Sequence, residues 1–230
     1  MTPDDYAKTA DALPDQWIED IYQREAEVPW ILEQLRDART VCDLGFGSGI
    51  VLRALLDAGK SVALVEGAAE FCERARAMQP ECAVHHTLFE DYWPVHRFDC
   101  VVASHIFEHV ADPVALMKRI TKWSDRMLVV VPNANSYHRQ LAVEMGLMPT
   151  VDTITQRDIA VGHPRVYTPR MLSAHLTESG WGCTATQGLY FKPLPNSMLA
   201  NLPRDLIAAM TRCRVPFKDC ANMAVVCEQA

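Results

Sequence analysis

Thr40-Val-Cys-Asp-Leu-Gly-Phe-Gly-Ser-Gly49 is the stretch of sequence that decides the fold, because an apolar strand runs directly into a turn with three glycines. The residues that follow, 48–58, have the apolar spacing of a helix, which ends at Gly59 in a C-terminal cap position. Glycines in such a turn allow positive φ angles and let backbone N–H groups approach a ligand without a Cβ in the way. Together with the helix N-terminus, the turn predicts a site for a negatively charged ligand group.

The segments on either side of this turn alternate between strand-like and helix-like patterns. Strands are expected at 61–65, 82–86, 98–103 and 126–131, and helices at 68–78 and 113–123. The opening residues 4–35 have helical spacing, and the second half predicts helices at 136–146, 168–180 and 204–212 with strands at 183–190 and 222–227. This alternation is typical of a parallel sheet covered by helices on both faces, an α/β fold.

Composition narrows the class of protein. The chain has 230 residues, of which 49% are hydrophobic, and a net charge of -7. The negative net charge disfavours a nucleic-acid surface, because phosphate binding requires clustered Lys and Arg. None of the eight cysteines forms a C-x-x-C pair, the N-terminus has no apolar export core, and no stretch approaches eighteen apolar residues. We therefore expect a cytoplasmic protein with reduced cysteines and no membrane or nucleic-acid partner.

A second acidic residue, Glu66, ends the next predicted strand, 21 residues beyond Gly45. A carboxylate at this position can accept hydrogen bonds from both ribose hydroxyls of a nucleotide-like cofactor. The alternative is a solvated acid that caps the following helix. A nicotinamide dinucleotide enzyme would also use these features, but its G-x-G-x-x-G order is missing because residue 50 is Ile.

The turn Asp43–Gly49 resembles the first motif of class I S-adenosylmethionine-dependent methyltransferases. The stretch Phe98-Asp-Cys-Val-Val-Ala-Ser-His-Ile-Phe-Glu-His-Val-Ala-Asp-Pro113 resembles the fourth-strand signature of their ubiquinone-biosynthesis-like branch. Residues 131–139, 162–167 and 191–196 resemble a bacterial small-molecule group related to that branch. The resemblance implies a Rossmann-like sheet of seven mostly parallel strands with the last strand antiparallel.

The resemblance also implies a division of the chain and a set of cofactor contacts. Residues 1–230 would form a single domain, with an N-terminal helical cap at 1–38, a cofactor-binding half at 39–132, an acceptor-binding half at 133–230, and a lid at about 147–167. The methionyl part of S-adenosylmethionine would contact Asp43, Gly45, Gly47, Gly49, Ser104 and His105, with Tyr6 as an additional contact. The ribose would contact Glu66 and Gly67, and the adenine would contact Leu88, Phe89 and Glu90.

Two further sets of polar residues are candidates for catalysis and acceptor binding. His105, at the end of a predicted strand, and His163 are the catalytic candidates, since general-base help is useful for a hydroxyl acceptor. Glu108 and His109 are expected to be structural and no metal is expected, because two adjacent residues do not make a closed metal site. The predicted acceptor-binding residues are Tyr137, His138, Arg139, Arg165, Tyr167 and Lys192. Arg139 and Arg165 would grip a carboxylate or phosphate.

The sequence therefore predicts methyl transfer to a small polar or anionic metabolite, with O-methylation favoured over N-methylation. The alternatives are a non-catalytic module that binds S-adenosylmethionine and, disfavoured by the glycine spacing, a nicotinamide oxidoreductase. The expected partner is the small-molecule acceptor, and the protein is expected to be a monomer or a homodimer.

Overall fold

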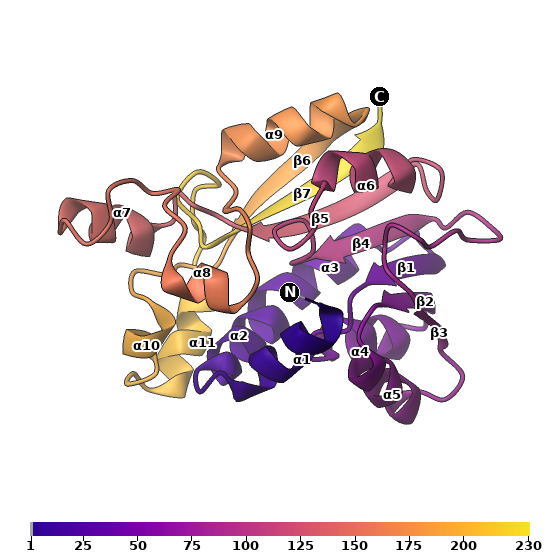
Figure 1. Ribbon diagram of the computed structural model, residues 1–230, viewed down its shortest axis with the longest axis horizontal. Coiled ribbons are helices and arrows are strands. Elements are labelled where there is room, and N and C mark those ends of the chain that lie inside the picture. The colour runs from indigo at the N-terminus through magenta and orange to yellow at the C-terminus, as the bar shows by residue number, and fades with distance from the viewer. Residues whose placement is uncertain (1) are drawn as a thin grey trace.

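The structure is a computed structural model that describes residues 2–230. Its centre is a seven-stranded sheet in the order β3-β2-β1-β4-β5-β7-β6 (Figure 1). Strands β1 to β5 are parallel, and β7 runs antiparallel to both of its neighbours. The predicted α/β fold with an antiparallel last strand is confirmed. The strand bounds are β1 Thr40–Leu44, β2 Ser61–Glu66, β3 Ala83–His86, β4 Cys100–Ser104, β5 Arg126–Pro132, β6 Trp181–Leu189 and β7 Asn222–Gln229.

Helices cover both faces of this sheet. In Figure 1, α6 and α9 lie above it, and α3, α4 and α5 lie below. The helix bounds are α1 Pro3–Ala12, α2 Gln16–Tyr22, α3 Val28–Gln34, α4 Ile50–Asp57, α5 Ala69–Met78, α6 Pro113–Ile120, α7 Tyr137–Glu144, α8 Gln156–Ala160, α9 Pro169–Glu178, α10 Asn196–Leu199 and α11 Arg204–Arg212. None of the described helices combines the length and the apolar run needed to cross a membrane.

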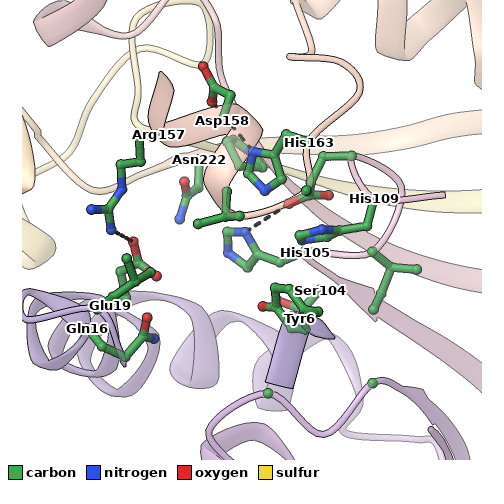
Figure 2. Close-up of a pocket in the computed structure, with 18 of the residues that line it drawn as sticks. Tyr6, Gln16, Glu19, Ser104, His105, His109, Arg157, Asp158, His163 and Asn222 are labelled. Carbon is green, nitrogen blue, oxygen red and sulfur yellow. Dashed lines mark hydrogen bonds and ion pairs between the residues drawn. The ribbon is translucent and has the colours of Figure 1, made fainter. Parts of the chain in front are cut away.

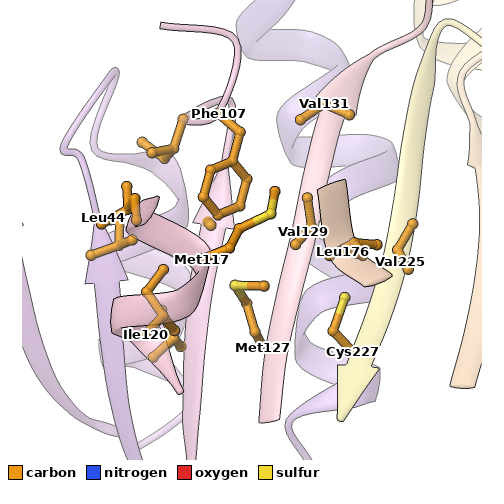
Figure 3. Packing of buried hydrophobic residues seen from close by; sticks show 14 of the residues in the cluster. Leu44, Phe107, Met117, Ile120, Met127, Val129, Val131, Leu176, Val225 and Cys227 are labelled. Atoms are coloured by element: carbon orange, nitrogen blue, oxygen red, sulfur yellow. The ribbon is translucent and has the colours of Figure 1, made fainter. Parts of the chain in front are cut away.

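The core consists of two apolar layers because successive strand residues point to opposite faces of the sheet. On β4 and β5, Val101 and Val129 face one layer, whereas Val102 and Val130 face the other. Figure 3 shows the first layer, where Met117 and Ile120 of α6 and Leu176 of α9 pack on the strands. Burial on both faces explains why these strands are continuously apolar in sequence.

The N-terminal region differs from the single helical stretch predicted at residues 4–35. Helix α1 stops at Ala12 because Pro14 disfavours helical dihedrals at Leu13. Between α2 and α3, residues Gln23–Glu27 form a π-helix, η1. Such wide turns occur frequently at functional sites. Here the turn contains Glu27, a carboxylate that is fully buried.

The predicted lid segment, 147–167, also contains a short helix that the sequence did not indicate. Helix α8 begins with a reciprocal capping box in which Thr155 accepts a hydrogen bond from the Asp158 backbone and the Asp158 side chain accepts one from the Thr155 backbone. On the N-terminal side, Arg157 of α8 binds Asp15 and Glu19, at distances of 2.9 and 3.1 Å. The segment is therefore fixed to the N-terminal helices by ion pairs.

Candidate active site

A cavity of about 1310 Å³ lies at the carboxyl ends of β1, β2, β4 and β5. Ligands of open α/β sheets bind at this edge. The N-terminal helices and the segment 147–167 contribute the remaining walls. The cavity brings together most of the predicted site residues: Tyr6, Asp43, Gly45, Gly47, Glu66, Gly67, Leu88, Phe89, Glu90, Ser104, His105, His138, Arg139, His163 and Lys192 all line it.

The glycine turn has the backbone conformation expected of it. Gly45, Gly47 and Gly49 have φ angles of 81°, 52° and 74°. A Cβ added to Gly47 would meet no atom within 4 Å and would project from a residue that lines the cavity. Gly49 differs, since it does not line this cavity. It is the N-cap of α4, and a Cβ there would lie 2.7 Å from the Phe46 ring, so its role is local packing.

Two buried acids face the cavity beside this turn. Glu66 accepts hydrogen bonds from the backbone N–H groups of Phe46 and Ala68 at 2.8 and 2.7 Å. Asp43 is 2% exposed, and its Oδ2 has no hydrogen-bond partner among the described residues. Burial and the neighbouring Glu66 raise the pKa of Asp43 to about 8. A cationic ligand that donates hydrogen bonds would satisfy both the orphaned oxygen and the charge.

His105 lies at the end of β4 in a left-handed conformation with a φ of 57°, which is uncommon for a residue other than glycine. Figure 2 shows its ring among the side chains that line the cavity. Its Nε2 lies 2.8 Å from Glu27 Oε1 and its Nδ1 lies 3.2 Å from Glu108 Oε1. Burial alone would lower the pKa of His105, but the Glu27 and Glu108 carboxylates raise it well above its usual range. Both ring nitrogens therefore have carboxylate partners.

Glu27 is a functional residue that sequence reasoning missed. Besides His105, it accepts hydrogen bonds from Asn222 at 2.7 Å and from Ser104 at 3.2 Å. These partners come from the ends of β7 and β4 and line the cavity, so the buried acid behind them joins three parts of the chain. The only sequence signal is a charged residue on a face of the helical region that otherwise packs on the sheet.

A pair of histidines, His109 and His163, lies next to this network. The rings of His109 and His163 meet at 4.5 Å, edge to face, and Tyr6 packs on His109 at 4.9 Å (Figure 2). His163 Nδ1 lies 3.6 Å from Asp158 Oδ1. Burial lowers the pKa of His109 to about 4, although the Glu108 carboxylate acts in the opposite direction. The lowered pKa keeps this imidazole neutral at pH 7.

The predicted arginine clamp is not assembled, which corrects the sequence-based expectation. Arg165 does not line the cavity, and its guanidinium donates to the backbone carbonyls of Phe107, Val110 and Ala111. Arg139 lines the cavity, but its side chain is buried and donates to the carbonyls of residues 151 and 153 and to Asp158. Both guanidinium groups brace loops, because carbonyls at loop turns satisfy their fixed donors.

The remaining acceptor candidates divide into two groups. Tyr137 packs on Phe191 and Tyr167 is a core residue whose hydroxyl lies 3.2 Å from His175; neither lines the cavity. His138 and Lys192 do line it, and burial lowers their pKa values to about 2 and about 8, respectively. Beyond them the wall is mainly apolar, with Leu141, Met145, Leu147, Met148 and Leu194.

Comparison with known proteins identifies the chain. Residues 15–186 match a family model described as a methyltransferase domain. The chain belongs to the class I methyltransferases. These enzymes use S-adenosylmethionine, so the predicted cofactor and enzyme class are confirmed, and the dehydrogenase and non-catalytic alternatives are not supported. No curated protein is a significant sequence match.

Solved methyltransferase structures share the fold at low identity. The magnesium protoporphyrin IX methyltransferase ChlM from Synechocystis PCC 6803, with bound SAH, has a TM-score of 0.65 and 12% identity over 99% of this chain and 94% of that chain. The CcbJ methyltransferase from Streptomyces caelestis has a TM-score of 0.62 and 15% identity over 90% of each chain. The glycopeptide N-methyltransferase MtfA, complexed with sinefungin, has a TM-score of 0.60 and 15% identity over 90% and 87%.

The methyltransferase's own residues fit its cofactor. The orphaned Oδ2 of Asp43 needs a hydrogen-bond donor, and the amino group of the methionyl portion could supply one. The open face of Gly47 leaves room for a ligand against the backbone. A carboxylate has about four acceptor positions, so Glu66 retains lone pairs for ribose hydroxyls beyond the hydrogen bonds that it accepts from backbone N–H groups.

Proposed function

We propose that this methyltransferase transfers the methyl group of S-adenosylmethionine to an oxygen atom of a small acceptor with a polar reactive end and an apolar body. One observation carries the proposal: the same cavity contains Asp43 and Glu66 near one end and His109 and His163 in another part of its wall. The cofactor supplies an electrophilic methyl carbon on a sulfonium. The protein supplies proximity and alignment, which contribute on the order of 7–11 kcal/mol.

At the cofactor end we assign the methionyl portion to Asp43 and the glycine turn, and the ribose to Glu66 and Gly67. Leu88, Phe89 and Glu90 would hold the adenine. Leu88 supports this assignment because it is 46% exposed although apolar, and it forms part of the cavity wall. An exposed apolar side chain beside a buried acid pair suits an aromatic base that covers it.

At the acceptor end we assign the reacting hydroxyl to the side of the cavity where His109 and His163 lie. His163 is the proposed catalytic side chain, because its Nδ1 faces Asp158 and its other nitrogen remains available. His105 is instead a positioning residue, since its two ring nitrogens are occupied by Glu27 and Glu108. The Glu27 network fixes the orientation of the loop that carries Glu108 and His109.

The walls of the acceptor region support the proposed shape of the substrate. Met145 and Leu147 are 69% and 70% exposed and lie beside the cavity, which favours an acceptor with an apolar body. Lys192 is the cation that an anionic substituent would meet, because the guanidinium groups of Arg139 and Arg157 already have partners. The polar or anionic character predicted from sequence is thus proposed for one end of the acceptor only.

N-methylation is the second candidate, and one observation favours it. The solved glycopeptide N-methyltransferase shares this fold. Burial keeps His109 neutral at pH 7, so this side chain places no positive charge beside an amine. We also propose a cytoplasmic location, since the eight cysteines are free thiols, and we retain the bacterial small-molecule branch as a prediction.

The test uses isotopically labelled S-adenosylmethionine and pairs of acceptors that share an apolar aromatic body and differ only in a hydroxyl or amino group. Mass spectrometry should detect label in the hydroxyl member of a pair. Glu66→Ala should abolish labelling, and His96→Asn, at an exposed histidine outside the cavity, should not. Label in amines alone would refute O-methylation.

A further inference from the structure

We propose that Glu108, His109 and His163 bind one divalent transition-metal cation of the Zn²⁺ or Co²⁺ type. The ligand atoms of these three side chains lie within 4.8 Å of one another. Two imidazoles and one carboxylate are a typical set for a catalytic zinc ion, with bonds of about 2.0–2.2 Å. Small side-chain rotations would bring the three atoms to those distances.

The unpaired oxygen of Glu108 is the observation that favours a ligand here. Glu108 is 1% exposed, and its Oε1 is held by His105 Nδ1 at 3.2 Å. Its Oε2 is buried and has no hydrogen-bond partner among the residues that the structure describes. A buried carboxylate oxygen without a partner is costly and demands an explanation. A cation between this oxygen and the two imidazoles would provide one.

Both imidazoles are also oriented as metal ligands usually are. A metal-bound histidine almost always gives its other ring nitrogen to a carboxylate or a carbonyl. His163 Nδ1 faces Asp158 at 3.6 Å, and the backbone of Gly162 hydrogen-bonds His109. Asp158 is fixed in turn by the backbone N–H and hydroxyl of Thr155, at 2.8 and 2.6 Å. One nitrogen of each ring is therefore free for a cation.

The place of the three ligands in the chain explains why the sequence did not predict a metal. Glu108 and His109 are adjacent on the loop after β4, and adjacent residues alone do not form a site. The third ligand, His163, comes from the segment 147–167, so a bound cation would connect that segment to the sheet. All three side chains line the cavity, which leaves an open coordination position toward the acceptor.

The consequence for the reaction rests on the proposed function, whereas cation binding does not. A divalent cation beside the acceptor would stabilise the ionised form of its hydroxyl and so lower its pKa. In the cation-loaded enzyme the hydroxyl proton would leave to solvent, and His163 would hold the cation instead of accepting that proton. The ionised oxygen would then bond to the methyl carbon as the carbon–sulfur bond breaks, with S-adenosylhomocysteine as the leaving group.

The test titrates the metal-free enzyme with Co²⁺, whose visible absorption reports nitrogen and oxygen ligands. We expect one Co²⁺ per chain, displaced by Zn²⁺. His163→Asn and Glu108→Gln should each weaken Co²⁺ binding by at least about tenfold, the lower end of what the loss of an outer-shell partner costs. His96→Asn, the same change at an exposed histidine, should bind as the wild type does.

Several results would overturn the metal site. These are no visible absorption in the wild type, unchanged binding in His163→Asn, or thiolate charge-transfer bands that place the ion on a cysteine. Circular dichroism establishes whether each variant is folded. If Glu108→Gln does not fold, His163→Asn alone tests the metal site. Co²⁺ binding without methyl transfer to any hydroxyl acceptor would refute the proposed O-methylation and leave the metal site standing. Hydroxyl methylation by an enzyme that takes up no Co²⁺ would do the reverse.

Discussion

Replacement of Asp43 by Asn tests the proposed cofactor site through the number of protons released when S-adenosylhomocysteine binds. The pKa of Asp43 is raised to about 8, so at pH 7 about nine-tenths of free enzyme molecules carry a proton on this carboxyl. An amino group bound within hydrogen-bonding distance favours the ionised carboxylate. We therefore expect that binding of S-adenosylhomocysteine at pH 7 releases up to about 0.9 proton per molecule from this group.

Calorimetric titrations in buffers of different ionisation enthalpy measure that number directly. The wild type should release close to one proton, and Asp43→Asn should lose this release together with part of the affinity. Asp37→Asn is the matched control, since Asp37 is exposed and does not line the cavity. Equal proton release by the wild type and Asp43→Asn would refute the assignment of Asp43 to the cofactor.

The same group predicts the pH dependence of stability without cofactor. Because its folded pKa lies above the ordinary value of 3.8, the folded state holds more protons than the unfolded state between about pH 4 and pH 8. The free energy of unfolding should therefore fall as the pH rises through this window, by at most about 6 kcal/mol at about 1.4 kcal/mol for each pKa difference of one. Urea unfolding should show a smaller decline for Asp43→Asn, and parallel curves would contradict this prediction.

Three further substitutions test other parts of the structure. Gly47→Ala should weaken S-adenosylhomocysteine binding, measured by calorimetry, by tenfold or more. The control is Gly59→Ala, since Gly59 also has a left-handed φ, of 73°, but lies away from the cavity. This control should lower the free energy of unfolding by about 1–2 kcal/mol and leave the affinity unchanged. Arg165→Ala should lower the free energy of unfolding by about 2–4 kcal/mol because it leaves three carbonyls unpaired, with cofactor affinity retained in the folded fraction. Because burial lowers the pKa of Lys192 to about 8, the free energy of unfolding of the wild type should rise between about pH 8 and pH 10. In urea unfolding, Lys192→Met should be more stable than the wild type at pH 7 and should not show this rise.

The fold around the proposed cofactor end of the site was predictable because its information is local. The strand from Thr40, the glycine turn and Glu66 follow each other within one β–α–β unit, and the backbone conformation of the turn requires glycine. Parallel pairing of β1 with β2 then places Leu44 beside Val65, which brings the two acids together. The alternation of strands and helices predicted a mostly parallel sheet, but it did not by itself give the order of the strands.

The acceptor end was not predictable in the same way, because its contacts join distant segments. Glu27 reaches His105 only through the widened turn η1, which no residue pattern indicates. Arg165 was predicted to bind an anion because it stands with His163 and Tyr167 in a segment expected to cover the site. In the folded chain, backbone carbonyls of the segment 107–111 accept its hydrogen bonds instead. The approach of His163 to His109 likewise depends on how segment 147–167 folds back.

The contact of Arg157 with Asp15 and Glu19 has a consequence for turnover. These ion pairs join α8 to α2 and its N-cap, and residues of both helices line the cavity that we propose holds both substrates. If the pairs must separate before S-adenosylhomocysteine leaves, dissociation of this product limits kcat. Such a limit would make kcat increase with ionic strength and decrease with solvent viscosity, because salt screens partly exposed charges and viscosity slows segment motion.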